Sequence, residues 1–528
     1  MFLINHQFFT FELKLLYHMG FKTISLKLPT DYTLEQLRIK ISKELQIIDF
    51  TFQIENKSLD ARNKSNIFWL VQVVVKSAEI KGGEEVNTET LEIRYKKRKE
   101  QVVVVGSGPA GFFAAFVLQK AGFNVTLIER GSEVTRRGKS IQTFEKTGIF
   151  DAQNNYAFGE GGAGTFSDGK LTSRSKHISL EKKFILTSYI EAGAPDEIAY
   201  MAHPHLGTDN LKKIVRNLRL TFEKLGGKIL FETMLEDIVT KKYKVTEIVT
   251  SQGILPADAL FIASGHSAYE TYKMLIRRGV PFRTKNFAIG SRMEHQQEII
   301  NKAQWGHVNL PGVKAAEYRL TSQADGKHQV FSFCMCPGGM VVPAAAYENT
   351  NIVNGMSYYN RNGKFANAAC VAGIHPDELA GKTVSPLEAL ENLKQMEEKF
   401  YQYSGGYKAP ACSITNFLKN KNREEKLESS YPLGLTSAPL WELLPTQIVQ
   451  SMQAGLTDFI RKMRGFETGN LIGLESKTSS PVQVIREPGG LVEGFENLFI
   501  VGEGSGYAGG IISSGADGIK AAMGLVLK

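Results

Sequence analysis

The chain has 528 residues, 42% hydrophobic and 22% charged, a composition that excludes a wholly disordered protein. At roughly 150 residues per domain it corresponds to about three to four domains, long enough to fold without disulfide or metal staples. Four Cys exclude a disulfide framework, and a net charge of +9 suits polyanionic ligands without by itself indicating nucleic acid.

The amino-terminal end carries no targeting signal that we can identify. Residues 1–18 are rich in Phe and Leu but lack a basic start and a small-residue cleavage site, so a signal peptide is not expected. One interpretation is a non-native leader ahead of a true start at Met19. No apolar run approaches the roughly 18 residues of a membrane span. We therefore expect a cytoplasmic protein without stable membrane insertion.

The first 80 residues are predicted to form a small α/β domain. Residues 22–28 alternate polar and apolar side chains, as a half-buried strand does. Thr33 and Gln36 have the spacing of a capping box, which predicts a helix directly after Thr33. Two further strand-like segments, 51–55 and 67–75, complete a βαββ order.

A buried strand, a glycine turn and a helix follow the charged linker. The run QVVVV at 101–105 is typical of a parallel strand, GSGPAG at 106–111 opens a helix over 109–121, and a second strand covers 124–129. This arrangement predicts a dinucleotide site with the pyrophosphate at the helix N-terminus and a ribose on Glu129. The predicted contacts are Gly106, Ser107, Gly108, Pro109, Ala110, Gly111, Glu129 and Arg130.

A second glycine-rich turn lies near the carboxyl end. Residues 498–518 read LFIVGEGSGYAGGIISSGADG, a strand followed by an acidic residue, a glycine loop and a helix. The segment resembles the second FAD fingerprint of the two-dinucleotide-binding-fold flavoproteins. The resemblance implies that Glu503 binds the ribityl–phosphate region and that the next helix start faces the flavin pyrimidine. The implied contacts are Gly502, Glu503, Gly509, Gly510 and Ile511.

A third segment, GEGGAGTFSDGKL at 159–171, is unusually rich in small residues. Such a run predicts backbone packed against a flat ligand, and in related flavoproteins the segment at this place lines the flavin ring. We expect Gly162, Gly164 and Thr165 to contact the flavin. The following Ser167, Asp168 and Lys170 are explained equally well by a substrate-facing role and by a simple SDG turn.

Together these segments resemble the bacterial family of uncharacterised FAD-dependent dehydrogenases, which carry a small N-terminal α/β domain. Further segments that carry the resemblance are SLDAR (58–62), HPHLGTD (203–209), CMCPGG (334–339), SSYPLG (429–434) and TSSPV (478–482). The resemblance implies an α/β fold with a Rossmann-like, glutathione-reductase-like FAD-binding domain, interrupted by an α+β substrate domain and preceded by the small βαββ domain. It supplies no substrate.

The resulting domain boundaries form one prediction. The two FAD fingerprints, nearly 400 residues apart, are expected to meet in space. The predicted parts are the N-terminal domain at 1–80 with the leader at 1–18, a charged linker at 81–100, the first FAD-binding part at 101–175, a substrate region at 176–480 with return strands near 209–268, and the last FAD-binding part at 481–528.

The sequence leaves the roles of several reactive side chains undecided. Cys334 and Cys336 are interpreted first as apolar or structural, with thiol redox chemistry as an alternative and metal binding least favoured. His203 and His205 suit a loop or the rim of a pocket better than catalysis. The GHSA turn at 265–268 marks only the chain's return to the FAD domain. We assign no metal ligand and no catalytic acid or base.

The function expected from these features is that of a nucleotide-binding FAD oxidoreductase or dehydrogenase. It would transfer a hydride through flavin N5 to or from a small organic substrate. NADH or NADPH is an optional transient reductant, because no second GxGxxG motif lies between about residues 150 and 350 to form a dedicated nucleotide domain. The alternatives are an RNA-associated flavoprotein, although nucleic acid is disfavoured, an isoprenoid double-bond reductase near a membrane surface, and a flavoprotein whose N-terminal domain docks a protein partner.

Overall fold

The structure is a computed structural model that describes residues 19–83, 89–323, 325–421, 423 and 425–528. The leader expected at 1–18 lies outside the described residues. The chain divides into two compact units. The smaller unit takes Met1–Glu89, Ala199–Ala202 and Leu310–Val313, and the larger unit takes the rest of the chain.

The smaller unit is a three-stranded antiparallel sheet with one helix. Its elements in chain order are β1 (Gly20–Leu28), α1 (Leu34–Leu45), β2 (Thr51–Asp60) and β3 (Phe68–Ser77), and the strand order is β1-β3-β2. The capping box predicted at Thr33 is confirmed, since its hydroxyl accepts from the Gln36 N–H at 3.2 Å. Leu37 and Ile41 of α1 pack with the buried side of β3 to form the core.

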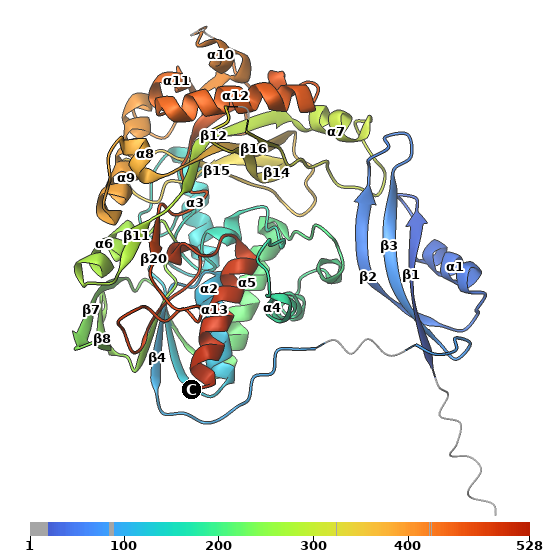
Figure 1. The fold of residues 1–528 in the computed structure, drawn as a ribbon, viewed down its shortest axis with the longest axis horizontal. Helices are drawn as coiled ribbons and strands as arrows, with labels where there is room; N and C mark the ends of the chain where they lie inside the picture. Colours follow the sequence, from blue (N-terminus) through green and yellow to red (C-terminus); the bar gives the residue numbers. More distant parts are fainter. Residues whose placement is uncertain (1–18, 84–88, 324, 422, 424) are drawn as a thin grey trace, which may run out of the picture. The chain divides into compact units, whose positions relative to one another are not determined.

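The larger unit is built on a five-stranded parallel sheet in the order β21-β10-β4-β5-β6, whose strand β4 is labelled in Figure 1. Its strands are β4 (Gln101–Val105), β5 (Asn124–Ile128), β6 (Lys228–Leu230), β10 (Ala259–Ile262) and β21 (Leu498–Ile500). Residues 102–105 are all buried, as expected for a strand covered on both faces. The predicted α/β fold with a parallel, Rossmann-like sheet is confirmed.

Helices cover one face of this sheet and a small antiparallel sheet covers the other. On the first face Phe113, Leu118 and Ile519 share a core with residues of α4 and α5. On the second face Val103 and Leu260 pack with Ile248. The covering elements are α2 (Pro109–Lys120), α4 (Ser179–Glu191), α5 (Gly207–Lys224) and α13 (Ile511–Val526) on the first face, and β7 (Leu235–Lys241), β8 (Lys244–Thr250), β9 (Gly253–Pro256) and α6 (Tyr269–Arg277) on the second.

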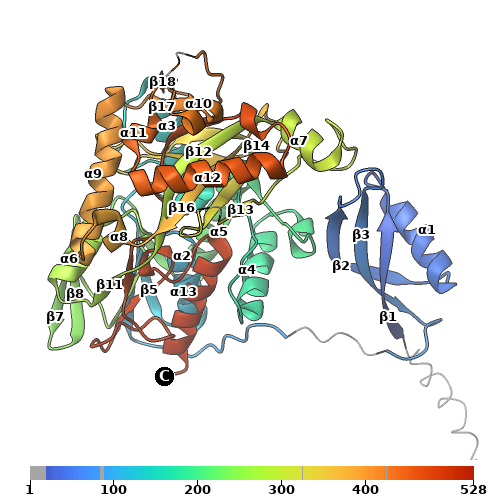
Figure 2. The ribbon, with the colours of Figure 1, turned by 45° about the horizontal axis from the view of Figure 1, so that its top comes forward.

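A second, largely antiparallel sheet lies between the two FAD-fingerprint segments in the sequence. Helix α12 (Thr446–Lys462) packs across it (Figure 2). The strands, in sheet order, are β13 (Thr321–Ser322), β14 (Val330–Pro343), β16 (Phe365–Ile374), β12 (Phe287–Gln296), β19 (Asn470–Glu475), β17 (Ala409–Ser413) and β18 (Leu435–Ser437), with β15 (Val353–Met356) beside β14. Strand β12 has no polar–apolar alternation that would reveal it, because nine of its ten residues are buried.

The sequence of residues 440–464 predicts a helix, but the segment forms two helices, α11 (Leu440–Leu443) and α12, because Leu444 takes an extended conformation with ψ 154° ahead of Pro445. The proline ring disfavours a helical conformation at the residue before it. The sequence reading had overlooked this break.

The remaining elements connect or cap these layers. They are α3 (Val134–Thr147), α7 (Gln297–Trp305), α8 (Pro376–Ala380), α9 (Pro386–Ser404), α10 (Ile414–Lys419), β11 (Phe282–Thr284), β20 (Val482–Val484) and the short 3-10 turns η1 (Ala163–Phe166), η2 (Asp196–Ala199), η3 (Phe466–Thr468) and η4 (Glu503–Ser505). Among the described residues, none of the helices combines the length and the apolar character needed to cross a bilayer.

Candidate functional site

A cavity of about 1030 Å³ lies within the larger unit, at the carboxyl ends of the parallel strands. Ligands of open α/β sheets bind at this edge. Thirteen of the predicted cofactor contacts line the cavity: Gly106, Gly108, Pro109, Ala110, Glu129, Arg130, Gly162, Gly164, Gly502, Glu503, Gly509, Gly510 and Ile511. The expectation that the two fingerprints meet in space is therefore confirmed.

The first glycine turn is explained by close backbone packing. Gly106 has φ +96°, and a Cβ there would lie 2.5 Å from the Ala263 carbonyl oxygen. A Cβ on Gly111 would lie 1.9 Å from the Gly106 carbonyl oxygen, so a side chain would push α2 away from β4. Gly108 differs, because the nearest atom to its Cβ position is the Gly162 Cα at 3.8 Å. At Gly108 the fold leaves open space beside the N-terminus of α2.

Glu129 holds this turn together. Its Oε2 accepts from the Ser107 N–H at 3.0 Å and the Ser107 hydroxyl at 2.7 Å, and its Oε1 accepts from the N–H groups of Gly131 and Gly159, both at 3.0 Å. The carboxylate is 5% exposed and still borders the cavity. The sequence predicted a ribose acceptor here and did not anticipate four protein donors.

The second glycine turn brings the start of α13 to the same cavity. Gly502 has φ +77°, and its Cβ would lie 2.6 Å from the Ala110 Cβ, so the two fingerprints touch directly. The Gly502 N–H donates to Asp517 Oδ2 at 2.7 Å, which ties the turn to the helix that follows. At Gly510, with φ +80°, no atom lies within 4 Å of the Cβ position.

The third segment, residues 159–171, packs between the two glycine turns. Gly162 has φ +62°, and its Cβ would lie 3.0 Å from the Gly108 Cα, while that of Gly164 would lie 3.1 Å from Ile511 Cγ1. Thr165 instead lines a separate small pocket together with Ser107, and Gly111 lines neither space. The predicted contact of Thr165 with a flavin therefore gains no support from this geometry.

A buried arginine, not singled out from the sequence, fixes this segment. The Arg137 guanidinium donates to the carbonyl oxygens of Glu160 and Gly162, both at 2.8 Å, and of Asn155 at 3.0 Å. Burial lowers its pKa to about 10. Nothing in the surrounding sequence, VTRRGK, distinguishes Arg137 from its basic neighbours.

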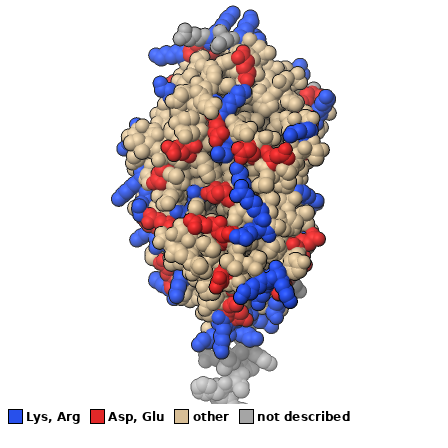
Figure 3. Space-filling view, turned by 90° about the vertical axis from the view of Figure 1, so that its left-hand side faces the viewer, with Lys and Arg blue, Asp and Glu red and all other residues tan. Residues whose placement is uncertain are grey.

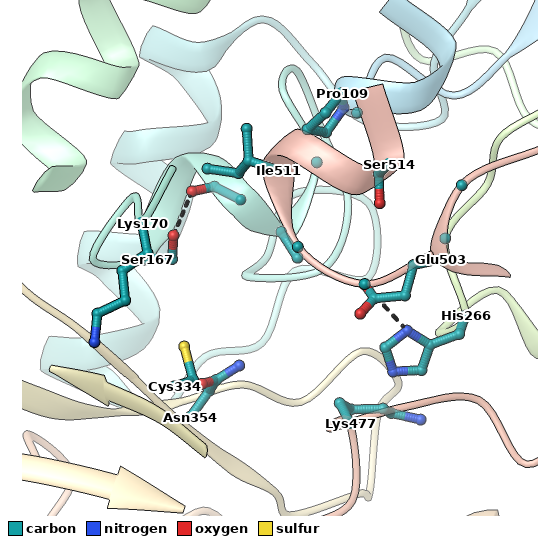
Figure 4. A pocket seen from close by; sticks show the side chains of 18 of the residues that line it. Pro109, Ser167, Lys170, His266, Cys334, Asn354, Lys477, Glu503, Ile511 and Ser514 are labelled. Carbon is teal, nitrogen blue, oxygen red and sulfur yellow. Dashed lines mark hydrogen bonds and ion pairs between the residues drawn. The ribbon is translucent and has the colours of Figure 1, made fainter. Parts of the chain in front are cut away.

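The GHSA turn at 265–268 was predicted only to return the chain to the FAD domain. It also contributes a histidine to the cavity. His266 is 7% exposed, its Nδ1 lies 3.4 Å from Glu503 Oε2, and its Nε2 has no partner among the described residues (Figure 4). The turn follows β10, a parallel strand, and this position at a strand's carboxyl end was the available signal.

Lys477 borders the same side of the cavity. It forms an ion pair with Glu397 at 2.9 Å and donates to the Tyr269 hydroxyl. Burial lowers the pKa of Lys477, and Glu397 offsets part of that effect.

The wall of the cavity formed by the third segment and its neighbours is strongly charged. Asp168 forms a buried pair with Arg361, with Oδ2 2.6 Å from Nη2. Glu317 accepts from His203 Nδ1 at 2.6 Å and lies 3.6 Å from Lys170 Nζ. Burial alone would raise the pKa of Glu317, but the His203 hydrogen bond and the Lys170 and Arg361 charges hold it well below its usual range.

The structure thus brings Ser167, Asp168 and Lys170 to the cavity, together with His203. His205 lies beside them, hydrogen-bonded to the Tyr359 carbonyl at 3.0 Å. Arg361 and Glu317 had no signal in the sequence, since neither lies in a motif. No group of three or more metal-ligating side chains occurs within the part of the chain that the structure describes.

The residues present fit a dinucleotide cofactor. Gly108 and Gly510 leave space where side chains would project, and two helix N-termini open onto the cavity. A parallel sheet with a glycine turn after β4 and a carboxylate after β5 defines the class: an α/β protein that binds a dinucleotide.

Comparison with known proteins narrows this class. Residues 99–252 match an FAD binding domain, and residues 286–478 match the family described as FAD-dependent protein, C-terminal domain-like. A protein of Clostridium beijerinckii (strain ATCC 51743 / NCIMB 8052), carried as "Uncharacterized protein", is 38% identical over 537 residues, 97% of this chain and 99% of its own length. The chain belongs to this family of FAD-dependent proteins and is an FAD-binding flavoprotein.

Solved structures that are similar to this chain have low sequence identity. Glycine oxidase from Bacillus cereus ATCC 14579 is 13% identical, with 81% of this chain and 95% of that chain covered and a TM-score of 0.31. L-proline dehydrogenase from P. horikoshii is 13% identical, with 81% and 94% covered and a TM-score of 0.33. At these scores neither structure informs the substrate of this chain.

Proposed function

We propose that the protein is an FAD-dependent oxidoreductase, a dehydrogenase or reductase acting on a small organic substrate. The observation that carries the proposal is a single cavity lined by both glycine turns and, elsewhere on its wall, by ionised side chains such as Lys170, Arg361 and Lys477. A cofactor alone would not require these charged groups, so we assign them to the substrate side.

Each part of the cofactor is assigned to its own group of residues. The free N–H groups at the start of α2 receive the pyrophosphate, and Glu503 with His266 faces the ribityl–phosphate region. The start of α13, at Gly510 and Ile511, directs its N–H groups and partial positive charge toward the flavin pyrimidine. In this arrangement a ribose hydroxyl replaces the Ser107 hydroxyl as a donor to Glu129.

When bound, FAD supplies hydride transfer at its N5 atom. The chain's own part is to orient both ligands and to exclude water. The proposed organisation is glutathione-reductase-like: the FAD-binding parts at 101–175 and 481–528 flank an α+β substrate region at 176–480, and a βαββ domain at 1–80 precedes them. The substrate region supplies the charged wall together with Asp168 and Lys170 of the third segment. NADH or NADPH enters, in this proposal, only as a transient reductant.

The first test replaces Gly108 by valine. The fold has room for this side chain, but the side chain would occupy the space assigned to the pyrophosphate. Gly108→Val should weaken FAD binding at least about tenfold, or ~1.4 kcal/mol, with an unchanged far-ultraviolet circular dichroism spectrum. The measurement is titration of the deflavinated protein with FAD, followed by flavin fluorescence.

Gly489→Val is the matched control, because Gly489 likewise has room for a side chain, with no atom within 4 Å of its Cβ position, but lies outside the cavity. It should bind FAD as the wild type does. Equal FAD affinity in Gly108→Val would contradict the placement of the pyrophosphate. Anaerobic bleaching of the bound flavin by NADH, NADPH or a metabolite panel then identifies the reductant, and a flavin that none of them reduces would count against the oxidoreductase assignment.

A further inference from the structure

Two cysteines separated by one residue lie on β14, at the cavity. All four cysteines of the chain are free thiols in the structure, and Cys336, Cys370 and Cys412 are buried. Cys334 is partly exposed and lines the cavity, where its sulfur is directed toward the open space below the Ile511 turn (Figure 4). The proposed function uses neither member of the pair.

The backbone around the pair is distorted in a way that presents Cys334. The pairing of β14 with β16 shifts register between Phe333 and Cys336, and Cys334 has φ 45°, in the left-handed region that non-glycine residues rarely adopt. Strand bulges of this kind redirect a side chain, and strained backbone concentrates at functional sites. A regular strand would not require this conformation.

The chain directly after the pair is tightly folded. A Cβ on Gly338 would lie 1.9 Å from the Arg361 carbonyl oxygen, and one on Gly339 would lie 3.0 Å from the Cys336 Cβ. The two glycines of CMCPGG therefore allow the backbone to turn closely behind the thiols.

A fully buried cation, Arg292, lies beside the cysteine pair. The Arg292 guanidinium donates to the Cys334 carbonyl oxygen at 2.7 Å and lies 3.6 Å from Cys336 Sγ, while Glu475 pairs with it at 2.9 Å. Cys336 Sγ in turn donates to the Cys334 carbonyl oxygen at 3.3 Å. A positive charge close to a cysteine favours its thiolate form, and Arg292 and Lys170 supply such charge near Cys334.

The thiols accordingly differ in acidity. The interaction with Cys336, together with the Arg292 and Lys170 charges, lowers the pKa of Cys334 below that of an ordinary thiol. The pKa of Cys336 is raised, by its hydrogen bond to Cys334 and by burial. Burial raises the pKa of Cys412 to about 12. Attacking thiols in exchange reactions react best when their pKa is near the ambient pH.

We propose that Cys334 and Cys336 form a thiol–disulfide exchange site within the cavity, with Cys334 as the attacking thiol, Cys336 as the resolving thiol and a small organic disulfide as the ligand. The ligand is small because Cys334 lies on the wall of a cavity of about 1030 Å³ rather than on an open surface. The proposal stands on the thiol cluster alone and does not depend on the proposed oxidoreductase function.

The reaction balances as two exchanges. The Cys334 thiolate attacks one sulfur of the ligand, so that a mixed disulfide forms, the ligand's S–S bond breaks and a thiolate leaves. Cys336, after losing its proton, attacks the Cys334 sulfur, which closes the Cys334–Cys336 disulfide and releases the second half of the ligand as a thiol. Two electrons pass from the cysteine pair to the ligand. A disulfide across one intervening residue is strained, which makes it readily reducible by thiols.

The test uses the full-length, reduced protein and dithiodipyridine as the probe. Released thiopyridone is followed by absorbance and the protein by intact mass. The wild type should rapidly release two equivalents, retain no adduct and lose the mass of two hydrogen atoms. Cys336→Ser should release one equivalent and retain a pyridyl adduct, because the resolving thiol is gone. Cys334→Ser should lose the fast phase, by at least about tenfold in rate.

Cys370→Ser is the matched control, since Cys370 is a buried cysteine on the neighbouring strand β16, and it should react as the wild type does. A fast phase that persists in Cys334→Ser, or a wild type that retains an adduct, would overturn the proposal. Proteolytic mapping of the oxidised wild type gives a readout that requires no variant to fold. A 334–336 disulfide supports the proposal and its absence refutes it.

Discussion

Asp168 is the residue on the charged wall whose position was least predictable. It lies in an SDG turn, which by itself suggests an exposed loop, yet its side chain is fully buried and paired with Arg361. The partner is 193 residues away in the chain. Sequence reasoning had no means of joining these two residues, because neither the spacing nor the composition around Arg361 marks it.

Replacing this carboxylate should be costly. Asp168→Asn leaves the buried Arg361 guanidinium without its closest counter-charge, for which about 3–5 kcal/mol of unfolding free energy is the usual loss. Asp237→Asn is the control, because Asp237 pairs with Arg278 at the surface and exposed pairs contribute roughly 0–1 kcal/mol. Urea unfolding at neutral pH measures both, and equal losses would show that Asp168 is not buried with its charge.

The Asp168 pair also sets a pH dependence. Burial alone would raise the pKa of Asp168, but Arg361 and Lys170 more than offset this and leave it lowered. A lowered folded-state pKa means that the stabilisation is present above the unfolded value, near 3.9, and is lost as the pH falls through the folded value. The stability difference between wild type and Asp168→Asn should therefore stay constant from pH 7 to 5 and shrink only in stronger acid.

At the same scale, the glycine positions were predictable and the roles of the polar residues were not. Gly106, Gly108 and Gly111 each serve a backbone requirement that a short motif encodes. Glu129 was recognised from its spacing, but its four protein donors come from Ser107, Gly131 and Gly159, and those contacts depend on how the third segment folds back.

Among the elements, α2 and α13 are packed closely where the two fingerprints meet. A Cβ on Gly518 would lie 2.0 Å from the Ala110 carbonyl oxygen, so the helices are in backbone contact at this point. Small residues at the crossing make this approach possible, and the contact places both helix N-termini at one cavity. The distance between the helices therefore determines the geometry of the proposed FAD site.

Two glycines of the same helix should respond in opposite directions to alanine. Gly518→Ala forces α13 away from α2 and should lower the unfolding free energy by about 1–3 kcal/mol. Gly524→Ala meets no atom within 4 Å and should raise it by roughly 0.5–1 kcal/mol through helix propensity. Urea denaturation of the two variants measures both changes in unfolding free energy. An unchanged or increased stability of Gly518→Ala would contradict the close crossing of the two helices.

Elements were predictable where their sequence pattern is local. The sequence predicts a helix over 511–526, and α13 has these bounds. Helix α2 ends one residue earlier than the predicted 109–121. The long strands β12, β14 and β16 were not foreseen, because they are buried on both faces or bent by bulges and so show no period of two. The Pro445 break, by contrast, was visible in the sequence and was missed.

For the whole molecule, the sequence predicted that distant segments share a cofactor, and the structure brings them to one cavity. It did not predict the opposite wall, because Glu317, Arg361 and Lys477 lie outside the segments that carry the family resemblance. On the face drawn in Figure 3, basic and acidic side chains are interspersed, so the net charge of +9 does not by itself outline a polyanion-binding stripe there.

The division into two compact units yields a calorimetric prediction. FAD stabilises the unit that binds it, by about 2.7 kcal/mol when the free cofactor is a hundred times its Kd. Added FAD should therefore raise the temperature of the unfolding transition that belongs to the larger unit and leave the transition of the smaller unit unchanged. Scanning calorimetry with and without FAD measures both, and an equal rise of the two would contradict separate unfolding units.

The direct contact between Gly502 and Ala110 has a consequence for biosynthesis. Strand β4 and helix α2 are translated long before β21 and α13, which complete the sheet and the cavity. A nascent chain therefore lacks the second glycine turn until residues 498–526 have been synthesised. Premature termination ahead of α13 would leave a chain that should not retain its coenzyme.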